Sequence, residues 1–406
     1  MGLPAHRVVA LGPDQLRDAH SLFAATIHRG PLDDQDWQHT ATTYSPGRTF
    51  GVVHDGALVG TATSFRTRTA VPGGAALPTA AVTRVGVRAD HTRRGVLTAM
   101  MHTQLRAAAR AAEPLASLRA SEAVIYERFG YGPATRGRHV RVPRPHRGWR
   151  AGAPAGGSVR LLGRSEIVPV LAPLQRRLAL RRAGGIERPD AWWWGLVQRR
   201  LDAREHVVAC VHTGPDGDDG FAVAFSHGVG PALTGRVLRV EDLHAGSVDA
   251  AAGLWRFLLS VDLVDTVEGW LRPLDEPLEL LLTDPRKCQV TGQEDETWLR
   301  LVDVPAALAA RSWGAAEPVL LGVSDTVLPE NSGVYRIGPD AVERVSCAEP
   351  ELECDVAGLA AAYLGDRMPS ALAVCGWWTV RDPVAVSRAD ALFAIGGPRP
   401  WCGTFF

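Results

Sequence analysis

The residues best suited to chemistry lie at 82–100, where a strand-like apolar run leads through a polar loop into a helical pattern. Arg93, Arg94 and Gly95 stand directly before that helix. The first N–H groups of a helix have no partner inside it, and with the helix dipole they form a site for phosphate oxygens. The two guanidinium groups add planar donors, and a glycine lets a ligand approach the backbone closely. The alternative is an ordinary surface loop, because arginine is abundant in this chain.

Several other catalytic classes are disfavoured by the same sequence. The loop does not follow the G-x-G-x-x-G pattern of a dinucleotide-binding Rossmann site. Lys287 is the only lysine among 44 Lys and Arg residues, and no glycine-rich loop precedes it, which argues against a Walker phosphate loop and against pyridoxal chemistry. The H-E-x-x-H and G-x-S-x-G signatures of metalloproteases and hydrolases are absent.

Charge and cysteine content indicate the expected partners and cellular compartment of the protein. Lys+Arg and Asp+Glu are 44 each, so there is no general attraction to nucleic acid or to an anionic membrane. Arginine pairs at 176–177, 181–182 and 199–200 are the candidates for a nucleic-acid surface, but their helical spacing is more typical of solvated faces. Six cysteines without C-x-x-C spacing indicate no metal site and a reducing, cytoplasmic location. We find no signal-peptide pattern and no run near the ~20 apolar residues of a membrane helix.

The elements that must position the loop form an α+β pattern in the first of three expected segments, 1–150, 151–300 and 301–406. The patterns predict, in order, a helix, a hairpin, a strand, a helix, a strand and a short helix, at 14–27, 50–65, 80–87, 95–112, 115–120 and 122–129. Residues 139–158 are rich in Pro, Gly and Arg and are interpreted as a linker.

The second segment repeats this order without a comparable Gly-Arg loop, so we interpret it as a degenerate copy of the first. Its expected helices lie at 164–183 and 250–261, and its expected strands at 206–212, 221–226, 235–243 and 278–282. The third segment holds strands at 320–323 and 333–337 and a helix at 356–364. The chain ends in Trp401, Phe405 and Phe406, which indicates a docked rather than a frayed terminus.

The loop motif carries a resemblance to a known family. Val85-x-Val87 followed by Arg-Arg-Gly-Val-Leu-Thr at 93–98 resembles the acetyl-CoA motif of GCN5-related N-acetyltransferases, in the form found in the Eis (enhanced intracellular survival) subfamily. The resemblance implies that backbone groups near Val85 pair with the pantetheine amides and that the start of the helix holds the pyrophosphate. The implied acetyl-CoA contacts are Val85, Gly86, Val87, Arg93, Arg94, Gly95, Val96, Leu97, Thr98, Ser121 and Glu122.

The stretch 121–131 resembles the next motif of that family, in which a tyrosine donates a proton to the departing CoA thiolate. Tyr126 stands at that position. A phenol with a pKa near 10 stays protonated at pH 7 and is able to protonate a thiolate. A buried aromatic anchoring a short helix is the alternative, and it is favoured for Tyr131, which follows a Phe-Gly turn.

The C-terminal stretches 331–335, 359–365 and 391–393 resemble the sterol-carrier-protein-like domain of Eis proteins. In that family the chain ends inside the N-terminal active site and the terminal α-carboxylate is the base, a role that falls here to Phe406. An α-carboxyl group with a pKa near 3.5 is a weak base, so burial or a water relay is required. A tail packed only for stability is the alternative.

The resemblance implies two tandem acetyltransferase-type domains, the second without a cofactor site, then a sterol-carrier-like α/β domain, assembled as a homo-hexamer. The expected function is acetyl-CoA-dependent N-acetylation of a primary amine on a cationic small molecule, aminoglycoside-like or a polyamine. The alternatives are a protein-lysine acetyltransferase and a lipid- or hydrophobe-binding carrier, the latter suggested by Trp377 and Trp378.

A cationic acceptor calls for acidic groups in its pocket. Candidate acceptor-binding residues are Asp33, Asp34, Asp36, Trp37 and Phe405. A solvated, Asp-rich helix start is an equally good interpretation of the three carboxylates. Phe405 stands where the aminoglycoside-modifying members of the family carry an acidic residue, which argues against aminoglycosides as acceptors.

Overall fold

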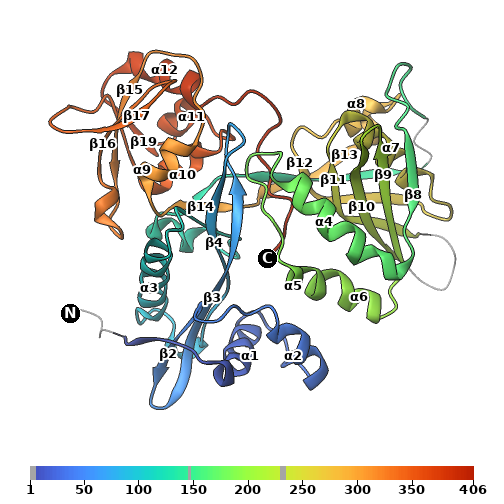
Figure 1. Ribbon diagram of the computed structural model, residues 1–406, viewed down its shortest axis with the longest axis horizontal. Coiled ribbons are helices and arrows are strands. Elements are labelled where there is room, and N and C mark those ends of the chain that lie inside the picture. Colours follow the sequence, from blue (N-terminus) through green and yellow to red (C-terminus); the bar gives the residue numbers. More distant parts are fainter. Residues whose placement is uncertain (1–5, 145–147, 229–234) are drawn as a thin grey trace. The chain divides into compact units, whose positions relative to one another are not determined.

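The computed structural model describes residues 6–144, 148–228 and 235–406 (Figure 1). Contacts divide the chain into two units. Unit 1 holds the residues up to Ala134, Thr297–Gly396 and Phe406, and unit 2 holds Thr135–Glu296 and Gly397–Phe405. Each unit therefore contains a strand that the expected segment boundaries would assign to a different domain. β7 (Arg136–Pro143) lies in the sheet of unit 2, and β14 (Trp298–Leu301) lies in the first sheet of unit 1.

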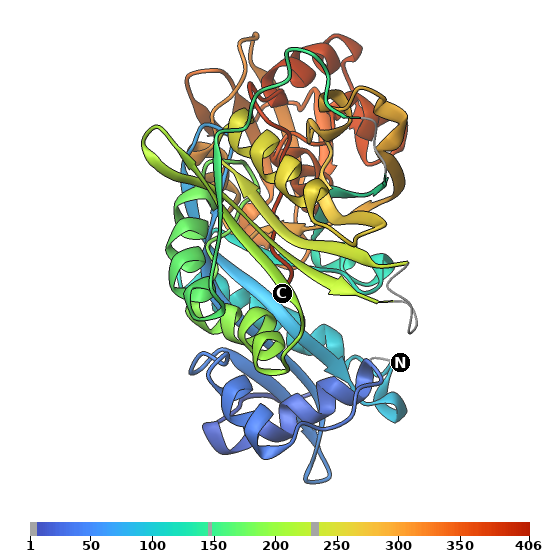
Figure 2. The same cartoon turned by 90° about the vertical axis from the view of Figure 1, so that its right-hand side faces the viewer.

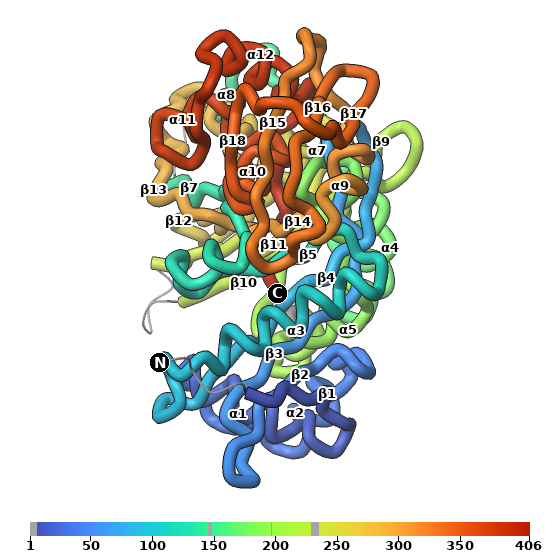
Figure 3. The backbone as a smooth tube through the Cα atoms, turned by 90° about the vertical axis from the view of Figure 1, so that its left-hand side faces the viewer, coloured from blue at the N-terminus to red at the C-terminus, as the bar shows by residue number. Residues whose placement is uncertain are grey.

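The first sheet of unit 1 contains the hairpin, strand, helix and strand that the sequence predicts. Its order is β1-β2-β3-β4-β5-β14-β6. The strands are β1 Val8–Ala10, β2 Thr49–His54, β3 Ala57–Ala70, β4 Ala76–Val87, β5 Leu115–Leu118 and β6 Gly132–Pro133. Strands β2, β3 and β4 are antiparallel, whereas β4 and β5 are parallel. The parallel pair requires a crossover, which α3 (Val96–Arg110) supplies (Figure 3).

Helices cover both faces of this sheet. A Cβ on Gly60 of β3 would lie 2.5 Å from Val96 Cγ1 of α3, and a Cβ on Gly86 of β4 would lie 2.9 Å from Thr26 Oγ1 of α1 (Leu16–Thr26). Gly60 is opposite Val87 in the register and Gly86 is opposite Thr61, so the two glycines belong to alternate rows and face opposite sides. The helices α1 and α3 therefore pack closely on opposite faces. The short α2 (Asp34–Ala41) follows α1.

The sheet of unit 2 repeats this plan, as expected of a copy. Its order is β13-β7-β12-β11-β10-β9-β8, and β11 and β12 are parallel with α7 between them. Val208 and Cys210 pack with α7, whereas Ala209 and Val211 pack with α4, so the two helices cover opposite faces (Figure 2). The strands are β8 Ser158–Leu161, β9 Val207–Gly214, β10 Gly217–His227, β11 Val237–Ala245, β12 Thr266–Pro273 and β13 Gln289–Asp295. The helices are α4 Ile167–Ala179, α5 Asp190–Trp193, α6 Arg199–Asp202, α7 Val248–Ser260 and α8 Leu278–Leu281.

Two sequence predictions in this region are wrong. The expected linker at 139–158 begins inside β7, because Val140 and Val142 alternate with polar residues and are buried in the core of unit 2. The expected strand at 278–282 is the short helix α8, since a short run with four leucines fits a buried helical turn as well as a strand. The sequence also concealed β12, whose apolar pattern is broken by Glu268, Gly269 and Arg272.

The second sheet of unit 1 has the order β17-β16-β15-β18-β19. Trp378 is 3% exposed, and its ring lies 5.5 Å from the ring of Phe393, so this aromatic side chain is part of the core. Trp377 packs against the same core. The strands are β15 Val319–Ser324, β16 Gly333–Ile337, β17 Val342–Val345, β18 Leu352–Asp355 and β19 Trp378–Val380, and the helices are α9 Val304–Ala310, α10 Val356–Tyr363, α11 Pro369–Val374 and α12 Pro383–Phe393.

Candidate active site

The candidate site in unit 1 begins where β4 leaves β5. The register between these strands pairs Thr79 with Leu115, Ala80 with Ala116 and Ala81 with Ser117. β4 continues to Val87 without a further registered partner in β5. Its backbone groups beyond Ala81 on that side are therefore available to an extended ligand with amide groups, in the way a further strand would pair.

A bulge in β4 lies in this free stretch. Thr61 of β3 is opposite Gly86 and Thr63 is opposite Thr83, so two residues of β4, Arg84 and Val85, face a single residue of β3. Arg84 has a φ of +51°, a conformation that non-glycine residues seldom adopt. A bulge bends the strand and redirects the side chains next to it. The side chains of Val85 and Val87 pack against the adjoining cores, so any contact with a ligand amide falls to their backbones.

The start of α3 has the features of an anion site. Gly95 is the N-cap residue with a φ of +86°, and no side chain caps the helix. Arg93 and Arg94 are exposed, whereas Val96 is buried and offers only its backbone N–H. Leu97 and Thr98 complete the first turn. The structure thus brings the predicted pyrophosphate-binding residues together around uncapped N–H groups.

Tyr126 lies between two short 3₁₀ turns, Ala123–Ile125 and Glu127–Phe129. Its side chain is 6% exposed and packs in the same core cluster as Val82 of β4. Burial, with a smaller contribution from Glu122, raises the pKa of Tyr126 to about 12. The phenol is therefore a neutral proton donor at every physiological pH. Ser121 and Glu122 are exposed ahead of it.

The terminal residue contacts this region of unit 1. The ring of Phe406 lies 5.5 Å from the ring of Phe65, edge to face at 84°. Phe65 on β3 is paired with Ala81, and Ala81 is paired with Ser117. The Phe406 side chain therefore packs on the row of residues at which β4 and β5 diverge.

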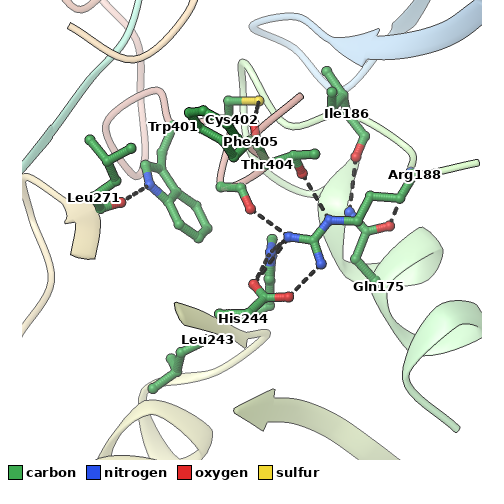
Figure 4. Close-up of polar contacts among 12 residues, drawn as sticks. Gln175, Ile186, Arg188, Leu243, His244, Leu271, Trp401, Cys402, Thr404 and Phe405 are labelled. Carbon is green, nitrogen blue, oxygen red and sulfur yellow. Dashed lines mark hydrogen bonds and ion pairs between the residues drawn. The ribbon is translucent and has the colours of Figure 1, made fainter. Parts of the chain in front are cut away.

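The residues just before Phe406 belong to unit 2 and are firmly bound there. Buried Arg188 donates to the Gly403 carbonyl at 2.6 Å and to Thr404 Oγ1 at 3.0 Å, and its guanidinium also contacts the Asp242 carboxylate (Figure 4). The Glu296 carboxylate accepts from the N–H of Cys402 at 2.9 Å and of Gly403 at 2.8 Å. We call residues 401–404 with these partners the tail clamp.

Phe405 faces unit 2. Its ring lies 5.4 Å from that of Trp270, and its carbonyl accepts from Trp192 Nε1 at 2.6 Å. Trp401 is held in the same way, since its Nε1 donates to the Leu271 carbonyl at 2.7 Å (Figure 4). The aromatic end of the chain is docked, as the sequence predicts.

The predicted acceptor-binding carboxylates lie at the start of α2. Asp33 caps α2 by accepting from the Asp36 N–H at 2.7 Å, and the exposed Asp34 pairs with Arg17 at 2.7 Å. These carboxylates serve the start of the helix, which was the alternative interpretation of the same pattern. Trp37 instead joins an aromatic cluster, with ring-centre distances of 6.0 Å to His20 and 6.1 Å to Tyr44.

Three further residues lie beside Trp37 and were not predicted from the sequence: Arg84, His20 and Tyr44. The Arg84 guanidinium donates to Thr43 Oγ1 at 2.6 Å and lies 4.4 Å from the centre of the Tyr44 ring. Burial and the nearby Arg84 lower the pKa of His20 to about 4, so it is neutral, and its Nδ1 lies 3.0 Å from the Tyr44 hydroxyl. The available signal was Arg84 itself, the one charged residue in the predicted strand at 80–87.

Unit 2 differs from unit 1 at the corresponding helix. The N-terminus of α7 is capped by Ser247, whose side chain accepts from the Ala250 N–H. The side chain thus occupies a donor that is free at the start of α3. The arginine pairs of this unit contact acids, for example Arg176 with Asp190 and Arg200 with Glu205.

Two other kinds of site are absent from the part of the chain that the structure describes. Across 6–144, 148–228 and 235–406, no three His, Cys, Asp or Glu side chains are grouped so that they could hold a metal ion. In the same ranges, no helix combines the length and apolar character needed to cross a membrane.

The divergence of β4 from β5, the bulge and the uncapped start of α3 define a GCN5-related N-acetyltransferase. Family comparisons agree. An acetyltransferase (GNAT) domain matches residues 7–134, a second acetyltransferase (GNAT) domain matches 184–301, and a sterol carrier protein domain matches 304–403. The expected fold class, two such domains followed by a sterol-carrier-like domain, is confirmed.

Relatives define the family more closely. The N-acetyltransferase Eis of Mycobacterium tuberculosis is 36% identical over 368 residues, which cover 86% of this chain and 87% of that protein. An uncharacterized N-acetyltransferase of Streptomyces avermitilis is 33% identical over 375 residues, 89% of each chain. The crystal structure of Eis1 from Mycobacterium abscessus matches with a TM-score of 0.89 at 37% identity, covering 98% of this chain and 100% of that one. The chain belongs to the Eis family of N-acetyltransferases and is an acetyl-transferring enzyme.

Proposed function

We propose that this enzyme transfers the acetyl group of acetyl-CoA to a primary amine by direct attack in unit 1. The amine nitrogen forms a bond to the thioester carbonyl carbon, and the C–S bond then breaks. Tyr126 gives its proton to the departing CoA sulfur, and the α-carboxylate of Phe406 takes a proton from the amine, directly or through water. Atoms and charge balance, because one proton leaves nitrogen and one reaches sulfur.

Acetyl-CoA fits the described residues in two places. The uncapped first turn of α3 with Arg93 and Arg94 offers donors to the pyrophosphate. The backbone of β4 beyond Ala81 offers unpaired groups to the pantetheine amides, and an N–H near Val85 is able to polarise the thioester carbonyl. Bound acetyl-CoA would supply the activated acyl group.

The observation that carries the proposal is the packing of Phe406 on Phe65, in the residue row where β4 and β5 separate. Tyr126 shares a core cluster with Val82, the next residue of β4. The Tyr126 side chain and the Phe406 ring thus both pack next to the free stretch of β4. A base at this position needs to be largely removed from water, and the apolar rings of Phe65 and Phe406 support that.

Steady-state CoA release with acetyl-CoA and a panel of primary amines, including polyamines and aminoglycosides, tests the proposal. General acids contribute about 10²- to 10⁴-fold, so Tyr126→Phe should lower kcat by about that factor with little change in the KM of acetyl-CoA. Tyr131→Phe is the matched control. Its hydroxyl is buried and has no hydrogen-bond partner among the described residues, and its ring contacts that of Tyr126 at 6.1 Å. Equal rates for the two variants would remove Tyr126 from the mechanism.

Several finer features stay predictions that rest on the resemblance. We expect a homo-hexamer, which sedimentation velocity would show, and a cytoplasmic location. A protein lysine is the second acceptor class, and mass spectrometry of a peptide library after reaction would detect its acetylation. Neither a lipid nor a nucleic acid is proposed as a partner, because Trp378 is core and the arginine pairs contact acids.

A further inference from the structure

Arg84 is a cation without a carboxylate partner among the described residues. Its contacts are the Thr43 hydroxyl at 2.6 Å and Tyr44, whose ring centre lies 4.4 Å away and whose hydroxyl also interacts with the guanidinium; the neighbouring His20 is neutral. Removing a charge from water is costly unless an opposite charge or several hydrogen bonds compensate. The guanidinium has five N–H donors, and its two hydrogen-bonding partners, Thr43 and Tyr44, are both neutral. Its charge and donors therefore favour an anion from outside the protein.

The position of Arg84 relates this cation to the acceptor and not to the CoA phosphates. It is a residue of the β4 bulge, directly before Val85, and its φ of +51° is strained. Its side chain reaches Thr43 and Tyr44, which follow α2, and none of its contacts is at the start of α3. The bulge thus directs the Arg84 guanidinium toward the aromatic cluster of Trp37 and Tyr44, beside the proposed position of thioester attack.

Two of the three carboxylates expected to bind a polycation have partners within the protein. Asp33 is used as the cap of α2, and Asp34 is paired with Arg17. An acceptor with several ammonium groups would meet the Arg84 guanidinium and repel it. Arg84 therefore adds a positive charge near the proposed acceptor position, where the sequence predicted only carboxylates.

We propose that Arg84 selects acceptor amines that carry a carboxylate in the same molecule. The inference rests on the proposed function and gives its substrate class: an amino acid or an ω-amino acid, whose carboxylate would accept a paired hydrogen bond from the planar guanidinium. Trp37 and Tyr44 supply the apolar surface for the carbon chain between the two charges.

Matched acceptor pairs test this, each with and without the carboxylate: phenylalanine and phenethylamine, and 6-aminohexanoate and hexylamine. Hydrogen bonds to charged groups predict that wild type has about tenfold or greater kcat/KM for the carboxylated member, mainly through a lower KM of the acceptor. Arg84→Gln should abolish the preference, and Arg84→Lys should restore part of it. The wild-type comparison needs no variant, so misfolding does not obscure it.

The possible outcomes distinguish a failure of the role of Arg84 from a failure of the acetyltransferase function. CoA release from amines without a preference for the carboxylate, or with a preference for polyamines, overturns the role of Arg84 and leaves the acetyltransferase intact. A raised KM of acetyl-CoA in Arg84→Gln, with unchanged acceptor preference, also overturns it, because Arg84 would then hold the cofactor. No CoA release from any acceptor by wild type overturns the proposed function and this inference together.

Discussion

The tail clamp allows the role of the chain terminus to be tested without touching Phe406. Glu296 is 1% exposed, and its two carboxylate oxygens accept from the backbone N–H groups of Cys402 and Gly403 at 2.9 and 2.8 Å. In Glu296→Gln one oxygen becomes an NH₂ group, which is a donor and faces another donor. One hydrogen bond to a charged group is lost, and the second becomes a bond to a neutral acceptor.

Hydrogen bonds to charged groups contribute about 1.5–3 kcal/mol each, so docking of the tail should weaken by about 2–3 kcal/mol. That corresponds to roughly 30- to 150-fold in the equilibrium between docked and released tail. This is an upper limit for the fall in kcat, because Arg188 still holds Gly403 and Thr404. The KM of acetyl-CoA should not change, since the start of α3 is untouched.

Two measurements on the same variant give the answer. Carboxypeptidase digestion followed by mass spectrometry reports release of the tail, and CoA release reports the chemical step. Glu294→Gln is the matched control, because Glu294 is half-exposed on β13 and pairs only loosely with His139 at 3.5 Å. Faster loss of Phe406 with an unchanged kcat would refute a catalytic role for the terminal carboxylate. Unchanged digestion would refute the assignment of Glu296 to the clamp.

Three further predictions follow from other parts of the structure. Replacing both Arg93 and Arg94 by Ala should raise the KM of acetyl-CoA about tenfold or more with kcat retained, as the affinity for a phosphate would fall; titration calorimetry with CoA checks it. Because burial raises the pKa of Tyr126 to about 12, the phenol keeps its proton, and kcat should not decline between pH 7 and 10; a basic limb in that window would contradict its role. Arg188→Met leaves the buried Asp242 carboxylate with His244 at 3.2 Å but without its arginine partner, and should lower the free energy of unfolding by about 3 kcal/mol in urea. Burial alone raises the pKa of Asp242, but Arg188 outweighs it and lowers the net pKa, so the stabilisation by this pair is present above pH 4 and should be lost as the pH falls below it.

The parts of the site that are local in sequence could be predicted. The strand, loop and helix at 82–100 carry their own signals, because a phosphate site at a helix start uses consecutive backbone N–H groups. Tyr126 is predicted by a short motif, and the aromatic end of the chain by its composition. The helix α1 and the strands β2 to β5 follow from apolar periodicity.

What the sequence could not predict depends on contacts between distant residues. The role proposed for Arg84 depends on Thr43 and Tyr44, about forty positions earlier, and on its having no carboxylate partner among the residues that the structure describes. Glu296 accepts hydrogen bonds from the backbone N–H groups of Cys402 and Gly403. Because nearly every residue type has such a group, the sequence does not indicate this contact. The carboxylates near α2 carry no local signal that separates an acidic pocket from a helix start, because both have the same pattern.

The most direct test of the central claim removes only the negative charge of the chain end. Ligation of a synthetic C-terminal peptide gives the protein with a Phe406 carboxamide, alongside a carboxylate control made in the same way. Both keep the Phe406 ring on Phe65. The mechanism predicts that the carboxamide binds acetyl-CoA normally and releases CoA about 10²-fold or more slowly than the control with a primary-amine acceptor. Equal turnover by the two proteins would contradict it.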